Sequence, residues 1–116
     1  MSNFTVEFYE TEDGDKPLVR FMDSIDGKLA AKLGLCIRLL MDGGPSLRAP
    51  YSKYLAEGIF ELRAKQSTNI ARALYFFAPG RLAVITHGFV KKQDKTPVAE
   101  LDRAVRYRND WERRRR

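Results

Sequence analysis

The alternation of apolar and polar positions predicts a strand followed by helices at the start of the chain. Phe4, Val6 and Phe8 are apolar at every second position, which indicates a half-buried first strand. Pro17 stands where a short helix begins, and apolar residues follow it at helical spacing. Asp26-Gly27 ends that helix. The first part of the chain is therefore expected to form one strand and one short helix.

A second, longer helix is predicted from a single apolar stripe. The stripe has the spacing i, i+4, i+7, i+8 and i+11 and consists of Leu29, Leu33, Cys36, Ile37 and Leu40. Gly43-Gly44-Pro45 ends this helix. We expect Lys28, Lys32 and Arg38 on its solvent-exposed face. Residues 46–57 show no clear period and are expected to be irregular.

From Gly58 onward the period changes to that of strands. Three strands are predicted, at residues 59–65, 69–78 and 81–89. Pro79-Gly80 makes a tight turn, and Pro97 opens a last helix. Short connections favour an antiparallel meander. We therefore expect an α+β fold of order β-α-α-β-β-β-α, an antiparallel sheet with the N-terminal helices packed on one side and a C-terminal helix.

Length and composition fit a single globular domain. The chain has 116 residues, 44% hydrophobic and 31% charged. We expect one domain over residues 1–112 and a basic arginine tail at 113–116. One cysteine, Cys36, and one histidine, His87, exclude an internal disulfide framework and a metal site of paired histidines. We expect no metal and no cofactor. Neither a membrane-spanning segment nor a signal peptide is evident, so we also expect no membrane partner and a cytoplasmic location.

The positive charge is concentrated in the second half of the chain. Residues 63–116 carry a net charge of +9 and residues 1–62 carry −3, which gives the total of +6. The four terminal arginines account for only part of this excess, since +5 remains over residues 63–112. Such a field attracts polyanions, and a nucleic acid is therefore the expected class of partner.

Arg72 is the candidate site residue that is hardest to explain as part of an ordinary surface. Ile70, Leu74 and Phe76 share its side of the predicted strand. A guanidinium in such an apolar row must be paired internally or point into a cleft. The residues alone leave both interpretations open.

Further basic groups lie on or just after the three predicted strands: Arg63, His87, Lys91 and Lys92. Each has a structural alternative. Arg63 could belong to a surface row with Glu61, His87 alternates with Ile85 and Phe89 as a core histidine would, and the lysines could be the exposed end of a strand. Together with nearby aromatic residues, however, a cluster of this kind holds single-stranded RNA.

Four motifs follow one another in the second half of the chain. They are Gly58-Ile59-Phe60-Glu61-Leu62-Arg63, Arg72-Ala73-Leu74-Tyr75-Phe76, His87-Gly88-Phe89-Val90-Lys91-Lys92 and Thr96-Pro97. In this order and spacing they resemble the motifs of phage Gp49-like, HigB-type toxins of the RelE/ParE toxin–antitoxin superfamily. Glu100-Leu101-Asp102-Arg103-Ala104 also resembles the start of that family's last helix. The similarity covers residues 4–108 and implies a RelE-like fold.

The resemblance implies a toxin that inhibits translation as a ribosome-dependent, metal-independent mRNA endonuclease. Such an enzyme cuts the codon in the A site by attack of the ribose 2′-OH on the adjacent phosphate. Arg72 stands at the position of the family's strand arginine and would clamp the phosphate. Lys91 and Lys92 stand at its basic strand-end pair and would stabilise developing charge. His87 is the candidate general base or acid.

The resemblance also implies partners and supporting residues. Candidate RNA-binding residues are Arg63, Lys65, Lys95 and Arg103. The expected partners are the ribosome, mRNA and a helix-turn-helix antitoxin of the HigA type. Tyr107 is the one tyrosine of the last helix, and we do not expect it to reach the phosphate. Two alternatives remain: a phage-derived nucleic-acid-binding protein without nuclease activity, and a ParE-like inhibitor of gyrase.

Overall fold

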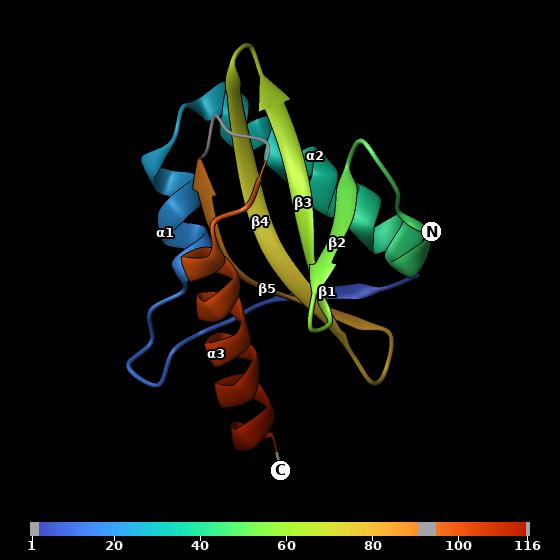
Figure 1. The fold of residues 1–116 in the computed structure, drawn as a ribbon, viewed down its shortest axis with the longest axis vertical. Coiled ribbons are helices and arrows are strands. Elements are labelled where there is room, and N and C mark those ends of the chain that lie inside the picture. Colours follow the sequence, from blue (N-terminus) through green and yellow to red (C-terminus); the bar gives the residue numbers. More distant parts are fainter. Residues whose placement is uncertain (1–2, 91–94, 116) are drawn as a thin grey trace.

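A five-stranded sheet of order β1-β5-β4-β3-β2 forms the centre of the fold (Figure 1). The computed structural model describes residues 3–90 and 95–115. The strands are β1 (Thr5–Phe8), β2 (Ser52–Ala56), β3 (Ile59–Gln66), β4 (Asn69–Ala78) and β5 (Leu82–Val90). The helices are α1 (Pro17–Ser24), α2 (Gly27–Gly43), the 3-10 turn η1 (Gly44–Ser46) and α3 (Val98–Arg114). The predicted α+β class is confirmed.

The two N-terminal helices pack on one face of the sheet, as expected. All five residues of the predicted α2 stripe are buried there. The carboxylate of Asp26 caps α2 by accepting hydrogen bonds from the backbone N–H groups of Lys28 and Leu29, at 3.0 and 3.4 Å. Pro17 begins α1, where its missing N–H costs no helical hydrogen bond. The apolar period therefore determines which side of each helix meets the sheet.

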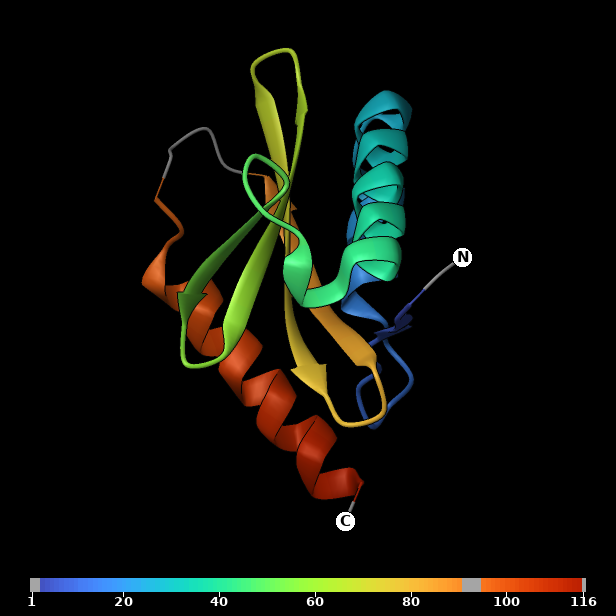
Figure 2. The same ribbon diagram turned by 90° about the vertical axis from the view of Figure 1, so that its right-hand side faces the viewer.

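The C-terminal helix α3 lies on the opposite face, so the sheet is enclosed between two helical layers (Figure 2). Ala104 of α3 is fully buried, and Leu101 and Val105 pack against the same cluster. The sheet contributes Leu74 and Phe76 to that cluster. This face also carries Arg63, Arg72 and His87, and His87 contacts α3 directly.

The sheet differs in two ways from an antiparallel meander. β1 pairs in parallel with β5, with Thr5 opposite Leu82, so the sheet is mixed. Parallel pairing of β1 with β5 is possible because α1 and α2 carry the chain from β1 to β2 at the opposite edge of the sheet. The strands β2 to β5 then follow one another back to β1. Ser52–Ala56, in the segment expected to be irregular, forms the edge strand β2, antiparallel to β3 with Ser52 opposite Leu62. The predicted order thus holds with one strand added.

A β-bulge in β5 changes the face on which His87 lies. Leu74 is opposite His87, but the next residue, Tyr75, is opposite Ile85, so Thr86 is the extra residue. Ile85 packs in the core under the N-terminal helices, whereas His87 contacts α3. The alternation that placed both residues on one face is therefore wrong at this point, because a bulge reverses it.

Gly88 allows α1 to approach the sheet, and we expect its replacement to be destabilising. A Cβ atom there would overlap the Phe21 ring and lie 3.1 Å from the carbonyl oxygen of Arg72. Gly88→Ala should lower the free energy of unfolding by about 1 to 3 kcal/mol in urea titrations, because the ring must move. Gly34→Ala in α2, where nothing lies within 4 Å, is the matched control. Equal stability of the Gly88→Ala protein and the wild type would contradict this account.

Candidate functional site

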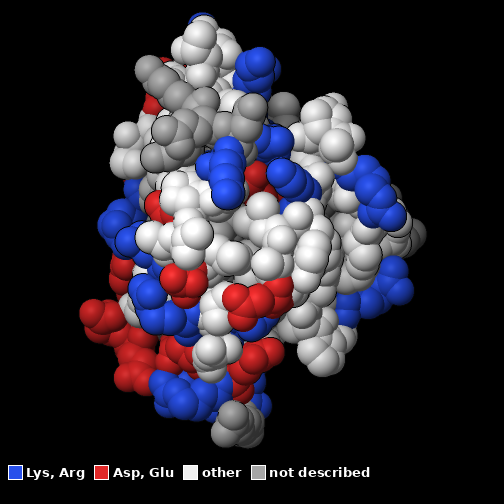
Figure 3. Space-filling view, viewed as in Figure 1, with Lys and Arg blue, Asp and Glu red and all other residues white. Residues whose placement is uncertain are grey.

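The candidate basic residues come together on the face of the sheet that α3 covers. Arg63 on β3, Arg72 on β4 and His87 on β5 all contact acidic side chains of this layer. Figure 3 shows Lys and Arg side chains in both halves of this face, with acidic side chains mainly in the lower half. Lys91 and Lys92 lie outside the described residues, so their placement stays a prediction.

Arg72 is paired inside the protein. Its side chain is 0% exposed, and its Nη1 atom lies 3.7 Å from Oε2 of Glu61, which is 1% exposed. The same nitrogen donates a hydrogen bond of 3.4 Å to Oγ1 of Thr96. Of the two interpretations left open by the sequence, internal pairing is the one observed. Leu74 shares its face of β4, as predicted.

Glu61 joins the two arginines of this face. Arg63 and Arg72 stand directly opposite each other in the β3–β4 register, where like charges repel. The Glu61 carboxylate lies between them, with Oε1 3.3 Å from Nε of Arg63 and Oε2 toward Arg72. Thr96 donates a further hydrogen bond to Oε2. A buried carboxylate thus compensates two cations and ties β3 and β4 to the segment before α3.

His87 is held by hydrogen bonds at both ring nitrogens. Nε2 lies 3.1 Å from Oε1 of Glu100 in α3, and Nδ1 lies 3.0 Å from Oγ1 of Thr86. The Thr86 hydroxyl also lies 3.2 Å from the carbonyl oxygen of Leu74. The bulge makes this contact possible, because it brings Thr86 and His87, neighbours in the chain, to the same side.

Both protonation states of His87 have complete hydrogen bonding. In the neutral ring with its proton on Nε2, the imidazole donates to Glu100 and accepts from the Thr86 hydroxyl. In the charged ring, Nδ1–H donates to Thr86, whose hydroxyl then turns to the Leu74 carbonyl oxygen. A side chain in this setting can gain and lose a proton without leaving a buried polar atom unpaired.

Burial lowers the pKa of His87 from its ordinary value, although Glu100 opposes this effect. The charges of Arg103 and Arg106 lower the pKa further, and the Tyr107 ring packs edge-on at 5.7 Å. In the unfolded chain, the His87 imidazole takes up a proton near its ordinary pKa of about 6.5. In the folded chain it does so only at lower pH. The unfolded state therefore binds more protons below that pH.

We expect stability to fall in mild acid for this reason. Urea unfolding at about pH 7.5 and about pH 5.5, on either side of the ordinary pKa, should show a smaller free energy of unfolding in acid. A His87→Gln protein should lose less stability over the same interval, because it lacks the proton uptake by the unfolded state. Equal losses in both proteins would mean that folding leaves the pKa of His87 unchanged.

The candidate RNA-binding residues remain accessible to solvent. Lys65, Lys95 and Arg103 are exposed, and the Arg63 side chain is 27% exposed beside its carboxylate partner. Arg103 lies 3.9 Å from Glu100. Among the predicted site residues that the structure describes, Arg72 and His87 are therefore buried, and the other four lie at the surface.

The described terminal arginines, residues 113–115, lie against the start of the chain. Arg113 and Arg114 form the last turn of α3, and Arg113 pairs with Glu12 at 3.0 Å. Arg115 pairs with Glu7 at 2.6 Å, and its guanidinium lies 4.4 Å from the centre of the Trp111 ring. Much of the charge expected in a tail is thus matched by acidic residues within the fold.

Two acidic residues of this site, Glu61 and Glu100, are not among the sequence candidates. Glu61 belongs to a row of alternating positions that would also fit the exposed face of a strand. The sequence pattern before Glu100 does not show where the chain runs, so it does not indicate that Glu100 reaches His87. The usable signal is the pair of facing arginines, Arg63 and Arg72, which requires a carboxylate once the β3–β4 register is known.

A comparison with known protein families finds a match that covers most of the chain. Residues 20–109, from within α1 to near the end of α3, match the family described as phage derived protein Gp49-like (DUF891). No curated protein matches the chain at a significant level. In the part of the chain that the structure describes, no helix is both long and apolar enough for a membrane span.

Proposed function

Because the chain belongs to the Gp49-like family of phage-derived proteins, within the RelE/HigB-type toxin group, we propose that it cleaves mRNA on the ribosome. The observation that carries the proposal is the arrangement of Arg63, Arg72 and His87 on one basic face, all within the matched residues. In this role it is a type II toxin that stops translation and acts in the cytoplasm, where its ribosomal target is found.

The proposed reaction is an internal phosphoryl transfer that requires no metal. The ribose O2′ attacks the adjacent phosphorus and loses its proton to a base, and the P–O5′ bond breaks. The leaving O5′ takes up a proton, so the products are a 2′,3′-cyclic phosphate and a 5′-OH. Such a reaction needs a base, an acid and cations near the phosphate.

His87 is proposed to handle the proton because its surroundings satisfy both the neutral and the charged ring. It is 2% exposed, and the Glu100 carboxylate at its Nε2 atom is 23% exposed. Glu100 can pass a proton between the imidazole and the RNA when the neutral ring carries its own proton on Nδ1, because Nδ1–H then donates to the Thr86 hydroxyl and Nε2 can accept. Lys91 and Lys92 keep the role expected from the sequence, stabilisation of negative charge on the phosphate.

Arg72 receives a positioning role in this proposal. A fully buried guanidinium paired with Glu61 cannot contact a phosphate in this conformation. Through Glu61 and Thr96 it fixes the segment that leads to Glu100. Binding of the RNA backbone falls to the accessible cations Arg63, Lys65, Lys95 and Arg103, as sequence analysis suggested.

The proposal includes a protein partner. A toxin of this kind requires an inhibitor in its host, and the expected one is a helix-turn-helix antitoxin encoded nearby. Co-expression with the neighbouring reading frame should restore growth of cells that produce the toxin.

Cell-free translation of a defined message tests the activity directly. Mapping of RNA 5′ ends should show cuts in phase with codons that require ribosomes and are absent with naked mRNA. Reactions with a Lys28→Glu protein, altered on the exposed face of α2, should behave as wild type. Intact mRNA in the presence of folded, RNA-bound protein would favour the alternative of a binding protein without nuclease activity, and DNA supercoiling assays would then test gyrase inhibition.

A further inference from the structure

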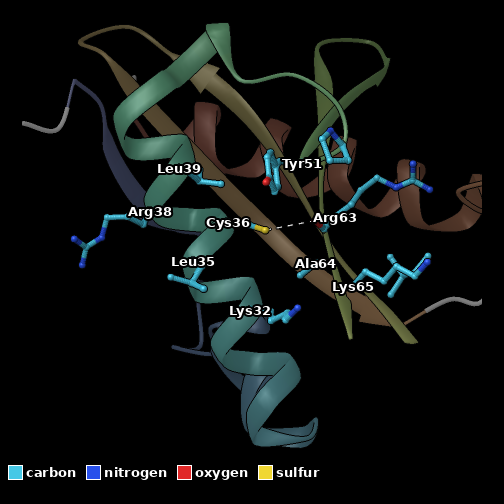
Figure 4. A pocket seen from close by; sticks show the side chains of 11 residues that line it. Lys32, Leu35, Cys36, Arg38, Leu39, Tyr51, Arg63, Ala64 and Lys65 are labelled. Atoms are coloured by element: carbon cyan, nitrogen blue, oxygen red, sulfur yellow. Dashed lines mark hydrogen bonds between the residues drawn. The ribbon is translucent and has the colours of Figure 1, made fainter. Parts of the chain in front are cut away.

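Tyr107 of α3 lies on the face of the sheet that also carries Arg63 and His87. The groove between α2 and β3 belongs to the opposite face, and Figure 4 shows the Arg63 side chain directed away from that groove. Inside the groove, the Cys36 thiol donates to the backbone carbonyl oxygen of Arg63 at 3.4 Å. Tyr107 is therefore a neighbour of the proposed reaction site, although the reaction proposed above gives it no role.

The helix α3 contacts His87 through two side chains, Glu100 and Tyr107. These residues are seven positions apart, about two helical turns, and therefore lie on the same side of the helix. Ala104 stands between them and is 0% exposed, and its small side chain lets α3 lie close to the sheet. Oε1 of Glu100 lies 3.1 Å from Nε2 of His87. The centre of the Tyr107 ring lies 5.7 Å from that of the imidazole, with the two planes at 81°.

Tyr107 is itself held by the residue that follows β1. Its ring stacks on Tyr9, with the ring centres 4.6 Å apart and the planes at 26°. Tyr9 is 3% exposed, and its hydroxyl donates to Asp110 at 2.5 Å. Phe89, two residues after His87 on β5, contacts the imidazole from its own strand at 6.1 Å. The imidazole thus meets one aromatic ring from β5 and one from α3, and these contacts restrict its rotation.

We propose that Tyr107 is a positioning residue that keeps the imidazole of His87 facing Glu100. Its effect on cleavage rests on the proposed function, whereas its effect on the orientation of His87 can be measured without any substrate. One face of the Tyr107 ring is covered by Tyr9, so that face is not available to a nucleobase. Tyr107 acts on the reaction through His87, because a small misplacement of a catalytic group strongly slows the chemical step.

Two other roles for Tyr107 predict different results. An acid or base requires the phenolic hydroxyl, so Tyr107→Phe would then be as slow as Tyr107→Leu. A purely structural residue requires only apolar volume, so both variants would then react at the wild-type rate once folded. Positioning by the ring predicts that phenylalanine preserves the function and leucine does not, since the contacts with Tyr9 and His87 are ring contacts.

Nuclear magnetic resonance of the intact chain tests the orientation directly. The chain has one histidine, so its imidazole signals belong to His87. Nuclear Overhauser contacts should join this ring to the side chains of Tyr107 and Glu100 in the wild type. Tyr107→Phe should keep the contact between His87 and Glu100, and Tyr107→Leu should lose it. Tyr107→Met takes the place of the leucine variant if leucine prevents folding.

Cleavage on the ribosome tests the consequence for the reaction. With the protein in excess, Tyr107→Leu should slow cleavage by about ten- to a hundredfold, while Tyr107→Phe retains the wild-type rate. Binding of RNA should be unchanged in both. In a His87→Gln background, Tyr107→Leu should slow cleavage no further, because a residue that acts through His87 has no effect once the imidazole is absent.

Trp111→Leu is the matched control. Trp111 lies one turn further along α3 and packs on Phe76, with ring centres 5.5 Å apart. This variant should lose stability in urea but keep the His87 signals and the wild-type rate.

Two results would overturn the proposal: an unchanged contact between His87 and Glu100 in folded Tyr107→Leu or Tyr107→Met, or the same loss in Trp111→Leu. Additive effects of Tyr107→Leu and His87→Gln on the rate would also overturn it. If the wild type does not cleave mRNA while the His87 signals change as expected, the nuclease proposal fails and the positioning of His87 by Tyr107 stands.

Discussion

Glu61→Gln is expected to lower the free energy of unfolding by about 3 to 5 kcal/mol, the usual effect of removing one partner from a buried ion pair. The carboxylate is 1% exposed and lies between two guanidiniums, one of which, Arg72, is 0% exposed. A neutral amide gives Arg72 much weaker electrostatic compensation. Urea unfolding followed by circular dichroism at neutral pH measures the loss.

A double variant separates the ion pair from the packing around it. Glu61→Leu combined with Arg72→Met removes both charges together and should recover most of the stability that Glu61→Gln loses. The same protein also tests the role of Arg72, because a folded double variant that still cleaves mRNA would show that cleavage requires no contact between Arg72 and the phosphate. Wild-type stability of Glu61→Gln would show that the pair contributes little.

His87→Gln is expected to slow cleavage by about 10²- to 10⁴-fold, the range typical of a lost general acid or base. Glutamine preserves a hydrogen-bonding side chain in the pocket but cannot transfer a proton. Codon-phased cuts followed over time in cell-free translation measure the effect. Binding of RNA should be unchanged, because the exposed cations are intact.

The pH dependence distinguishes a role in chemistry from a role in structure. The wild-type rate should fall in acid as His87 becomes protonated, at a pH below the ordinary imidazole value because burial lowers its pKa. Glu100→Gln should shift this profile to lower pH, because Glu100 raises the pKa of His87. A His87→Gln protein that is folded and cleaves at the wild-type rate would remove His87 from the mechanism.

Local pattern was sufficient for the helices and for most of the sheet. Each residue of the α2 stripe packs on the same layer, so its period survives folding. β2 was missed because it has only five residues, and Lys53 and Tyr54, adjacent in it, are both exposed at the sheet edge. Its strand conformation depends on pairing with β3, which no local window contains.

The candidate site could be predicted only in part, because some of its contacts are local and others depend on strand pairing. Arg72 was identified because a guanidinium within an apolar row is unusual in any fold. Its partner Glu61 and the orientation of His87 depend on the β3–β4 register and on the extra residue Thr86. A bulge is a long-range property of two strands, so alternation along β5 alone could not reveal it.

The contact between the two ends of the chain affects the order in which the protein can be completed during synthesis. The hydroxyl of Tyr9 donates to Asp110 at 2.5 Å across a separation of 101 residues, and Trp111 and Arg115 hold Glu7 in the same way. β1 therefore emerges from the ribosome long before the helix that fixes it. Glu100, on that same helix, is also the partner of His87. A nascent chain thus lacks the assembled site until its last helix has been released.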